Sequence, residues 1–283
     1  RLKAKYLFAR LKCGESLDFA KIIAPELPSH AICTVLGVPK SDRLELCSWI
    51  DQGIEAESAS VIAVEHLRKV RDYAKNLIAK KKAKPEEDIF SKIVHAKFEE
   101  DGSSLSDYEL GSFFALLFPA GAETTTRSIS GGMLALIENP DQMERLRKTP
   151  ELMKTAIEEI VRWTTPSVYK RRTATIDTEL GGKKILTGQK VTFWEMSANR
   201  DEAVFSDPFY FDVSRDPNKH LGFGAGVHFC LGASLARLEL KVFFEEFLKS
   251  NLYLDMDTPV TWTPNNRLVG IKNMFTRVRE NAD

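Results

Sequence analysis

One feature most constrains what this chain can form: the run Phe-Gly-Ala-Gly-Val-His-Phe-Cys-Leu-Gly from Phe223 to Gly232. A glycine-rich turn there delivers one cysteine to the start of a helix. Gly224 and Gly226 let the backbone bend and approach a flat ligand closely, which a side chain would obstruct. Residues 231–238 continue at helical spacing after Cys230, and the amides and dipole at a helix N-terminus favour a thiolate. The run therefore predicts a thiolate held against a metal.

Other interpretations of this run are weaker. A dinucleotide-binding fingerprint requires a third glycine where this chain has Phe229. A zinc site is not indicated, because Cys13, Cys33 and Cys47 lie far upstream and form no Cys-x-x-Cys pair. Outside such a run, a lone cysteine beside a helix is more often a small buried apolar residue.

The composition excludes several classes of partner. The 40 Lys and Arg residues balance the 40 Asp and Glu residues, so no overall charge favours nucleic acid or a membrane surface. No apolar run approaches the roughly 18 residues of a membrane span. Four scattered cysteines in 283 residues indicate a reducing compartment. We expect a cytoplasmic protein with no nucleic-acid partner and no membrane span.

Helical periodicity covers the first part of the chain, up to about residue 163. We expect a helix pair over 2–38 interrupted by Pro25-Glu26-Leu27-Pro28, a helical region over 41–83 and a helix over 88–100. A long helix should run from a capping box at Ser104 or Ser106 to about Ile137. Shorter helices should follow over 140–148 and 150–163.

The pattern changes to short strands after Pro166. Residues 173–176 and 184–186, separated by Gly181-Gly182, predict a hairpin, and residues 190–194 predict another strand. The last 30 or so residues predict further short strands. The fold class is therefore mostly α, with small sheets segregated toward the C-terminal half in an α+β arrangement. No internal repeat or linker divides the chain, so we expect one domain over 1–283.

The middle of the long helix has an unusual composition. Pro119 removes a backbone hydrogen bond, and Gly121 and three successive threonines, 124–126, lower helix stability. One interpretation is an ordinary buried, bent helix. The other is a distorted turn that offers a groove, backbone groups and a hydroxyl to a small ligand.

The run at Phe223–Gly232 resembles the haem-binding signature of the cytochromes P450, with Cys230 at the position of the axial iron ligand. Ala120, Gly121, Glu123 and Thr124 resemble the family's motif in the long helix over the haem. The resemblance implies that Thr124 hydrogen-bonds dioxygen or water at the haem and that Glu123 helps to relay protons. It also implies the P450 fold, with the long central helix over the haem.

Further positions match the family's pattern. Glu159, Arg162 and Arg215 resemble its structural glutamate–arginine–arginine network, which is not catalytic. His228 and Arg172 resemble the basic residues that bind the haem propionates. By the same resemblance, Phe223, Gly224 and Gly232 contact the cofactor. We expect His30, His66, His95 and His220 to be ordinary surface or capping residues.

The resemblance implies a monooxygenase that carries haem b and hydroxylates an apolar small molecule, such as a terpenoid, sterol or lipid, with O2. Electrons would come from a ferredoxin and a ferredoxin reductase. A basic patch at Lys219, Arg237 and Lys241 is one candidate dock for an acidic ferredoxin, and scattered solvated charge is the alternative. The residues expected to line the substrate pocket are Phe113, Leu117, Val168 and Leu268.

The resemblance also predicts that the chain corresponds to a cytochrome P450 from about its helix D onward, without the N-terminal part. Two alternative functions therefore stay open at this point. One is a truncated, catalytically inactive haem-binding fragment. The other is a peroxide-driven haem-thiolate enzyme, against which the pair Glu123-Thr124 argues, because proton delivery serves the activation of O2.

Overall fold

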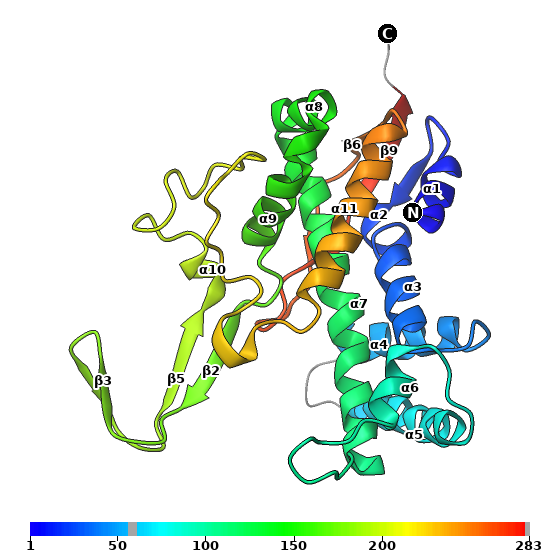
Figure 1. The fold of residues 1–283 in the computed structure, drawn as a ribbon. Coiled ribbons are helices and arrows are strands. Elements are labelled where there is room, and N and C mark those ends of the chain that lie inside the picture. Colours follow the sequence, from blue (N-terminus) through cyan, green and yellow to red (C-terminus); the bar gives the residue numbers. More distant parts are fainter. Residues whose placement is uncertain (56–60, 281–283) are drawn as a thin grey trace. The chain divides into compact units, whose positions relative to one another are not determined.

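The computed structural model describes residues 1–55 and 61–280 (Figure 1). The chain forms two compact units. The first unit combines Arg1–Ile22 with Arg127–Asp283, and the second is Ile23–Thr126. The long helix α7 (Asp107–Glu138) contributes residues to both.

The second unit is helical. It contains α3 (Glu26–Val35), α4 (Arg43–Glu55), α5 (Val61–Ala83), α6 (Ile89–Val94) and the part of α7 up to Thr126. Its core gathers buried aliphatic side chains around Phe90, Phe114 and Phe118, and the Phe90 and Phe114 rings meet edge to face with centroids 5.1 Å apart. The helical region expected over 41–83 is present, except that residues 56–60 lie outside the described part of the chain.

Two predictions in the second unit are wrong in detail. The helix expected over 88–100 ends at Val94, because the chain then turns back on itself: Phe98 N–H donates to Ser103 O and Gly102 N–H to Phe98 O. The interruption expected at Pro25-Glu26-Leu27-Pro28 is present only up to Pro25, which caps α3. This helix begins at Glu26 and contains Pro28 in its first turn, where no intrahelical N–H is needed.

The start of α7 follows the second of the two predicted capping boxes. Ser106 N–H donates to Glu109 Oε2 at 2.8 Å, and Glu109 N–H donates to Ser106 Oγ at 3.3 Å. The helix continues through Pro119 without a break and ends at Glu138.

The first unit packs helices against short strands. Its helical segments are α1 (Leu2–Ala9), α2 (Phe19–Ile22), α8 (Pro140–Lys148), the 3-10 turn η1 (Pro150–Leu152), α9 (Met153–Thr164), α10 (Glu195–Ala198), the 3-10 turn η2 (Gly226–His228), α11 (Ala233–Lys249) and the remainder of α7. Figure 1 shows α9 beside α11, with which it is in contact. Phe243 of α11 meets Phe8 at 5.1 Å and Phe19 at 6.1 Å between ring centroids, which fixes α1 and α2 on this helix.

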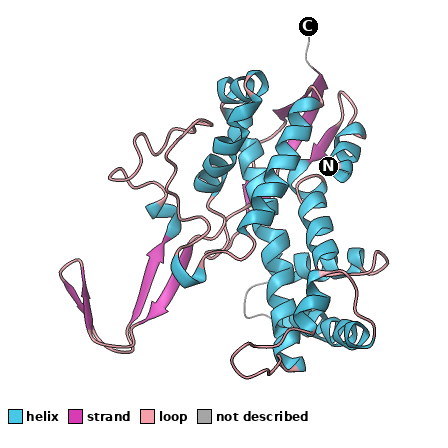
Figure 2. Ribbon diagram, in the orientation of Figure 1, coloured by secondary structure: helices cyan, strands magenta, loops and turns pink. Residues whose placement is uncertain are grey.

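The strands of the first unit form small antiparallel sheets (Figure 2). The three-stranded sheet has the order β1 (Ser16–Asp18), β9 (Phe275–Glu280), β6 (Leu252–Met256). The pairs are β2 (Tyr169–Thr173) with β5 (Lys190–Trp194), β3 (Thr178–Leu180) with β4 (Lys183–Ile185), and β7 (Thr261–Trp262) with β8 (Ile271–Asn273). The predicted mostly helical class with small sheets is confirmed.

Two strand predictions need correction. The hairpin turn is at Gly181-Gly182 as predicted, with φ of +58° and +75°, but its first strand is β3 rather than 173–176. The first residue of that expected strand, Thr173, is the last residue of β2 and pairs with Lys190. Sequence periodicity also missed β1, whose pairing with β9 joins residues more than 250 positions apart.

Candidate functional site

Cys230 closes a tight loop in the first unit. Its N–H donates to Phe223 O at 2.8 Å, and Phe229 N–H donates to Gly226 O at 3.0 Å. Gly224 and Gly226 have φ of +71° and +64°, a left-handed conformation that favours glycine. The helix α11 begins three residues after Cys230, so the thiol lies just before a helix N-terminus.

The side chains around this thiol are apolar and exposed. Val227, Phe229 and Leu231 have exposed fractions of 98%, 52% and 80%, and the Cys230 thiol itself is exposed. Exposed apolar area of this kind marks a surface that a ligand, another protein or a membrane covers. A Cβ at Gly232 would lie 4.0 Å from the Cys230 sulfur, so the glycine keeps that side of the sulfur open. The loop therefore fits a flat, apolar group that carries its own metal.

Two exposed basic residues of the first unit suit carboxylate groups on such a ligand. His228 ends η2 and makes no hydrogen bond to another described residue. Arg172 lies on β2, where it donates to Arg171 O at 3.0 Å and has its guanidinium 5.7 Å from the centre of the Phe193 ring. Neither pairs with a carboxylate among residues 1–55 and 61–280.

Glu159, Arg162 and Arg215 meet in a buried ion-pair network. Arg162 Nε and Nη2 donate to the two oxygens of Glu159 at 2.7 Å each, and Arg215 Nε lies 3.2 Å from Glu159 Oε2. Arg162 also donates to Asn199 O and Pro208 O, at 2.8 Å each. The network thus joins α9 to residues 199–215, the segment that leads into the cysteine loop.

A second network beside the first was missed by the sequence interpretation. Glu158 accepts hydrogen bonds from Arg237 Nε at 2.7 Å and Arg237 Nη2 at 2.8 Å, and it lies 3.1 Å from His220 Nε2. Burial raises the pKa of Glu158, but these hydrogen bonds outweigh it and lower that pKa to about 2. The only sequence signals were the positions of Glu158 beside Glu159 and of His220 just before the loop.

These contacts correct three expectations. The side chain of His220 is 3% exposed, so it is no surface residue, and His66 is also buried. The predicted basic patch is weakened, because Arg237 is neutralised by Glu158 and Lys241 lies 3.8 Å from Glu245. Its third member, Lys219, is exposed.

The motif on α7 lies in the second unit. Thr124 Oγ1 donates to Ala120 O at 2.9 Å, which commits its proton and leaves its oxygen lone pairs to accept. A Cβ at Gly121 would lie 2.6 Å from Ile32 Cδ1, so this glycine permits close packing of α3 on α7. Glu123 is partly exposed.

The residues expected to line a substrate pocket fall in both units. Val168 and Leu268 come together in the first unit, where Val168 N–H donates to Arg267 O at 3.0 Å and Ser167 bridges to Leu268. In the second unit, Phe113 lines a shallow depression with Tyr108 and Leu116, while Leu117 packs against the helical core.

Within the described part of the chain, no cluster of three or more His, Cys, Asp and Glu side chains could hold a metal ion. A metal at Cys230 would therefore need further ligands from a cofactor. None of the described helices is both long and apolar enough to cross a bilayer.

Comparison with protein families gives one match, to the cytochrome P450 model over residues 57–268. The protein named cytochrome P450 126 of Mycobacterium tuberculosis is 48% identical over 99% of this chain and 69% of its own length. The methyl-branched lipid omega-hydroxylase of the same species is 44% identical over 81% of this chain and 55% of its own length. The steroid C26-monooxygenase of Mycolicibacterium smegmatis is 43% identical over 80% of this chain and 53% of its own length.

Solved structures show the same fold. The polyketide-synthase cytochrome P450 PksS of Bacillus subtilis aligns with a TM-score of 0.91 and 34% identity, over 98% of this chain and 72% of that one. A Bacillus megaterium enzyme solved with testosterone aligns with a TM-score of 0.88 and 33% identity, over 97% of this chain and 75% of that one.

Proposed function

Since this chain belongs to the cytochrome P450 family of oxidoreductases, we propose that it holds haem b on the Cys230 thiolate and hydroxylates an apolar small molecule. The observation that carries the proposal is the exposed Cys230 thiol at the start of α11, ringed by exposed apolar side chains. Bound haem supplies the activation of O2 and the insertion of one oxygen atom into a C–H bond.

We assign the cofactor contacts to residues of the loop and of the family motif. Cys230 is the iron ligand, with Phe223, Gly224 and Gly232 against the ring. His228 and Arg172 bind the propionates, because each is an exposed basic side chain that makes no ion pair with a described carboxylate. From the α7 motif, Ala120 and Gly121 are assigned to the cofactor by the family resemblance.

Glu159, Arg162 and Arg215 hold the cysteine loop rather than take part in the chemistry. A buried carboxylate with two arginines leaves little freedom to the segment before the loop, because each broken contact would leave a charge unpaired. This rigidity would keep the Cys230 thiolate in position to bind the metal.

We assign to Thr124 and Glu123 the delivery of the protons that O2 activation requires. The Thr124 hydroxyl donates a hydrogen bond to Ala120 O, so its oxygen can accept a hydrogen bond from water or a protonated ligand. Glu123 immediately precedes Thr124 and is partly exposed, so we assign to it the relay of protons from solvent.

The substrate is a terpenoid, sterol or lipid-like molecule, in line with relatives named for branched lipids and steroids. Phe113, Leu117, Val168 and Leu268 supply apolar contacts to it. The electron donors are a ferredoxin and a ferredoxin reductase, and the protein works in the cytoplasm.

The test is the spectrum of the haem-reconstituted, reduced protein with carbon monoxide. We expect a thiolate-type Soret band that Cys230→Ser removes and that Cys13→Ser, which alters another exposed thiol, retains. A band unaffected by Cys230→Ser, or no haem uptake, would refute the assignment. If Thr124→Ala leaves product formation per electron unchanged, the proton-delivery role is wrong.

A further inference from the structure

Glu158 makes contacts quite different from those of its neighbour Glu159. The two carboxylates follow each other on α9, but Glu159 binds the segment that precedes the cysteine loop, whereas Glu158 binds residues on both sides of the loop itself. Its bond to Arg237 is bidentate, with both distances below 2.9 Å, a geometry that a screened surface pair rarely keeps.

Arg237 connects Glu158 to the C-terminal side of the loop. This arginine lies on α11, about two turns after Cys230, and its guanidinium lies 4.4 Å from the centre of the Phe223 ring. The carbonyl of Phe223 in turn accepts the Cys230 N–H at 2.8 Å. A chain of three contacts therefore runs from Glu158 to the backbone of the ligand cysteine.

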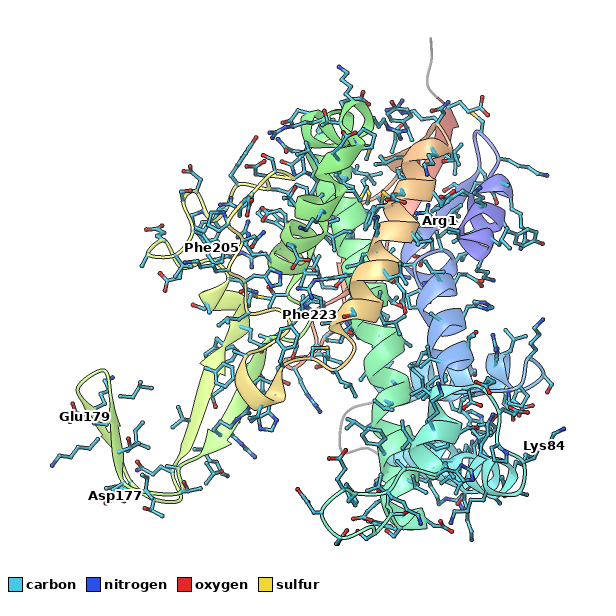
Figure 3. The ribbon with its side chains drawn as sticks, viewed as in Figure 1. Arg1, Lys84, Asp177, Glu179, Phe205 and Phe223 are labelled. Atoms are coloured by element: carbon cyan, nitrogen blue, oxygen red, sulfur yellow. The ribbon has the colours of Figure 1, made fainter. Side chains whose placement is uncertain are left out.

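His220 connects Glu158 to the N-terminal side of the loop. Gly222 N–H donates to His220 Nδ1 at 3.1 Å, so the ring proton is on Nε2, which donates to Glu158. The centres of the His220 and Phe223 rings lie 5.8 Å apart (Phe223 is labelled in Figure 3). Glu158 thereby holds the two sides of the loop at a fixed separation.

The network also sets the charge near the thiolate. Arg237 interacts electrostatically with Cys230, and its hydrogen bond to Glu158 raises the pKa of its guanidinium. With Glu158 in place, the guanidinium charge is largely neutralised. Without it, Arg237 loses the two hydrogen bonds that hold its guanidinium against the Phe223 ring.

We propose that Glu158 is a positioning residue for the Cys230 loop, acting through Arg237 and His220 on the geometry in which the loop holds the thiol. The part of this inference that concerns haem rests on the proposed function. The part that concerns the thiol does not, because the contacts are made by the protein alone.

The experiment compares Glu158→Gln with Glu151→Gln, which removes an exposed carboxylate at η1, just before α9. In the haem-free protein, the alkylation rate of Cys230 by iodoacetamide is measured by mass spectrometry, with the exposed Cys13 as internal standard. We expect several-fold faster alkylation of Cys230 in Glu158→Gln, with Cys13 and Glu151→Gln unchanged. Equal rates in all three proteins would overturn the proposal.

In the haem-reconstituted protein, Glu158→Gln is expected to reduce the thiolate-type share of the carbon monoxide spectrum. Arg237→Lys keeps a cation but loses the bidentate bond, so it should reproduce the spectral loss. An unchanged spectrum in Glu158→Gln would contradict the proposal. Failure of haem to bind Cys230 in the parent protein would refute the proposed function, while the alkylation result would still decide the role of Glu158.

Discussion

Glu239 is a buried carboxyl group on α11 whose protonation should control the stability of the first unit. Its Oε2 atom has no hydrogen-bond partner among the described residues, and burial raises the pKa of the group from 4.5 to about 8. The carboxyl is therefore neutral in the folded chain at pH 7, where it would be ionised in the unfolded chain. Folding must then take up a proton, and stability falls as the pH rises.

The magnitude follows from the two pKa values. Between 4.5 and about 8, the unfolded chain has released this proton and the folded chain has kept it. The interval is about 3.5 pH units, and at about 1.4 kcal/mol per unit the folded state loses at most about 5 kcal/mol by pH 8. Glu239→Gln keeps the shape but cannot ionise, so it removes this loss.

Urea unfolding at pH 5, 6.5 and 8 measures the effect. We expect Glu239→Gln to match the parent chain near pH 5 and to exceed it increasingly toward pH 8. The control is Glu246→Gln on the same helix. Burial alone would raise the pKa of Glu246, but hydrogen bonding to Arg1 and the nearby cations Lys249 and Lys5 lower it, so that variant should be less stable than the parent at pH 6.5. Parallel pH profiles for Glu239→Gln and the parent would refute the reasoning.

Three further predictions concern packing and ion pairs. Gly121→Ala should destabilise the chain by about 1–3 kcal/mol in urea unfolding, because its Cβ would lie 2.6 Å from Ile32 Cδ1, whereas Gly111→Ala on the same helix meets nothing within 4 Å and should stabilise it by about 0.5–1 kcal/mol. Arg162→Ala should cost about 3–5 kcal/mol in the same assay, since it removes both 2.7 Å hydrogen bonds to a fully buried carboxylate and leaves Arg215, at 3.2 Å, to balance its charge. The pKa of Glu158 is lowered from 4.5 to about 2, which contributes up to about 3 kcal/mol to the free energy of unfolding above pH 4.5. This contribution is lost as the pH falls toward 2, so the unfolding free energies of Glu158→Gln and the parent, measured during acid titration, should converge below pH 3.

The sequence predicted most of the helices because their signals are local. The capping box at Ser106 and Glu109 and the helix over 140–148 depend on residues within a few positions of one another. The strand β1 could not be predicted in this way, because three residues carry no periodicity and its partner β9 lies at the other end of the chain. The early end of α6 depends on hydrogen bonds within the following turn, which override the helical pattern.

In the candidate site, too, residues with local sequence signals could be predicted and residues brought together by the fold could not. Cys230 and its glycines could be found from sequence because the loop is one continuous segment with a rare residue pattern. The residues that hold the loop come from α9, α11 and the preceding segment, and Glu158 and Glu159 are adjacent in sequence yet bind different partners. Adjacent positions on a helix project about 100° apart, so one pair of carboxylates can bind two different segments. A change at either carboxylate should therefore reach the thiolate by a different path: Glu159 through the segment before the loop, and Glu158 through the two sides of the loop itself.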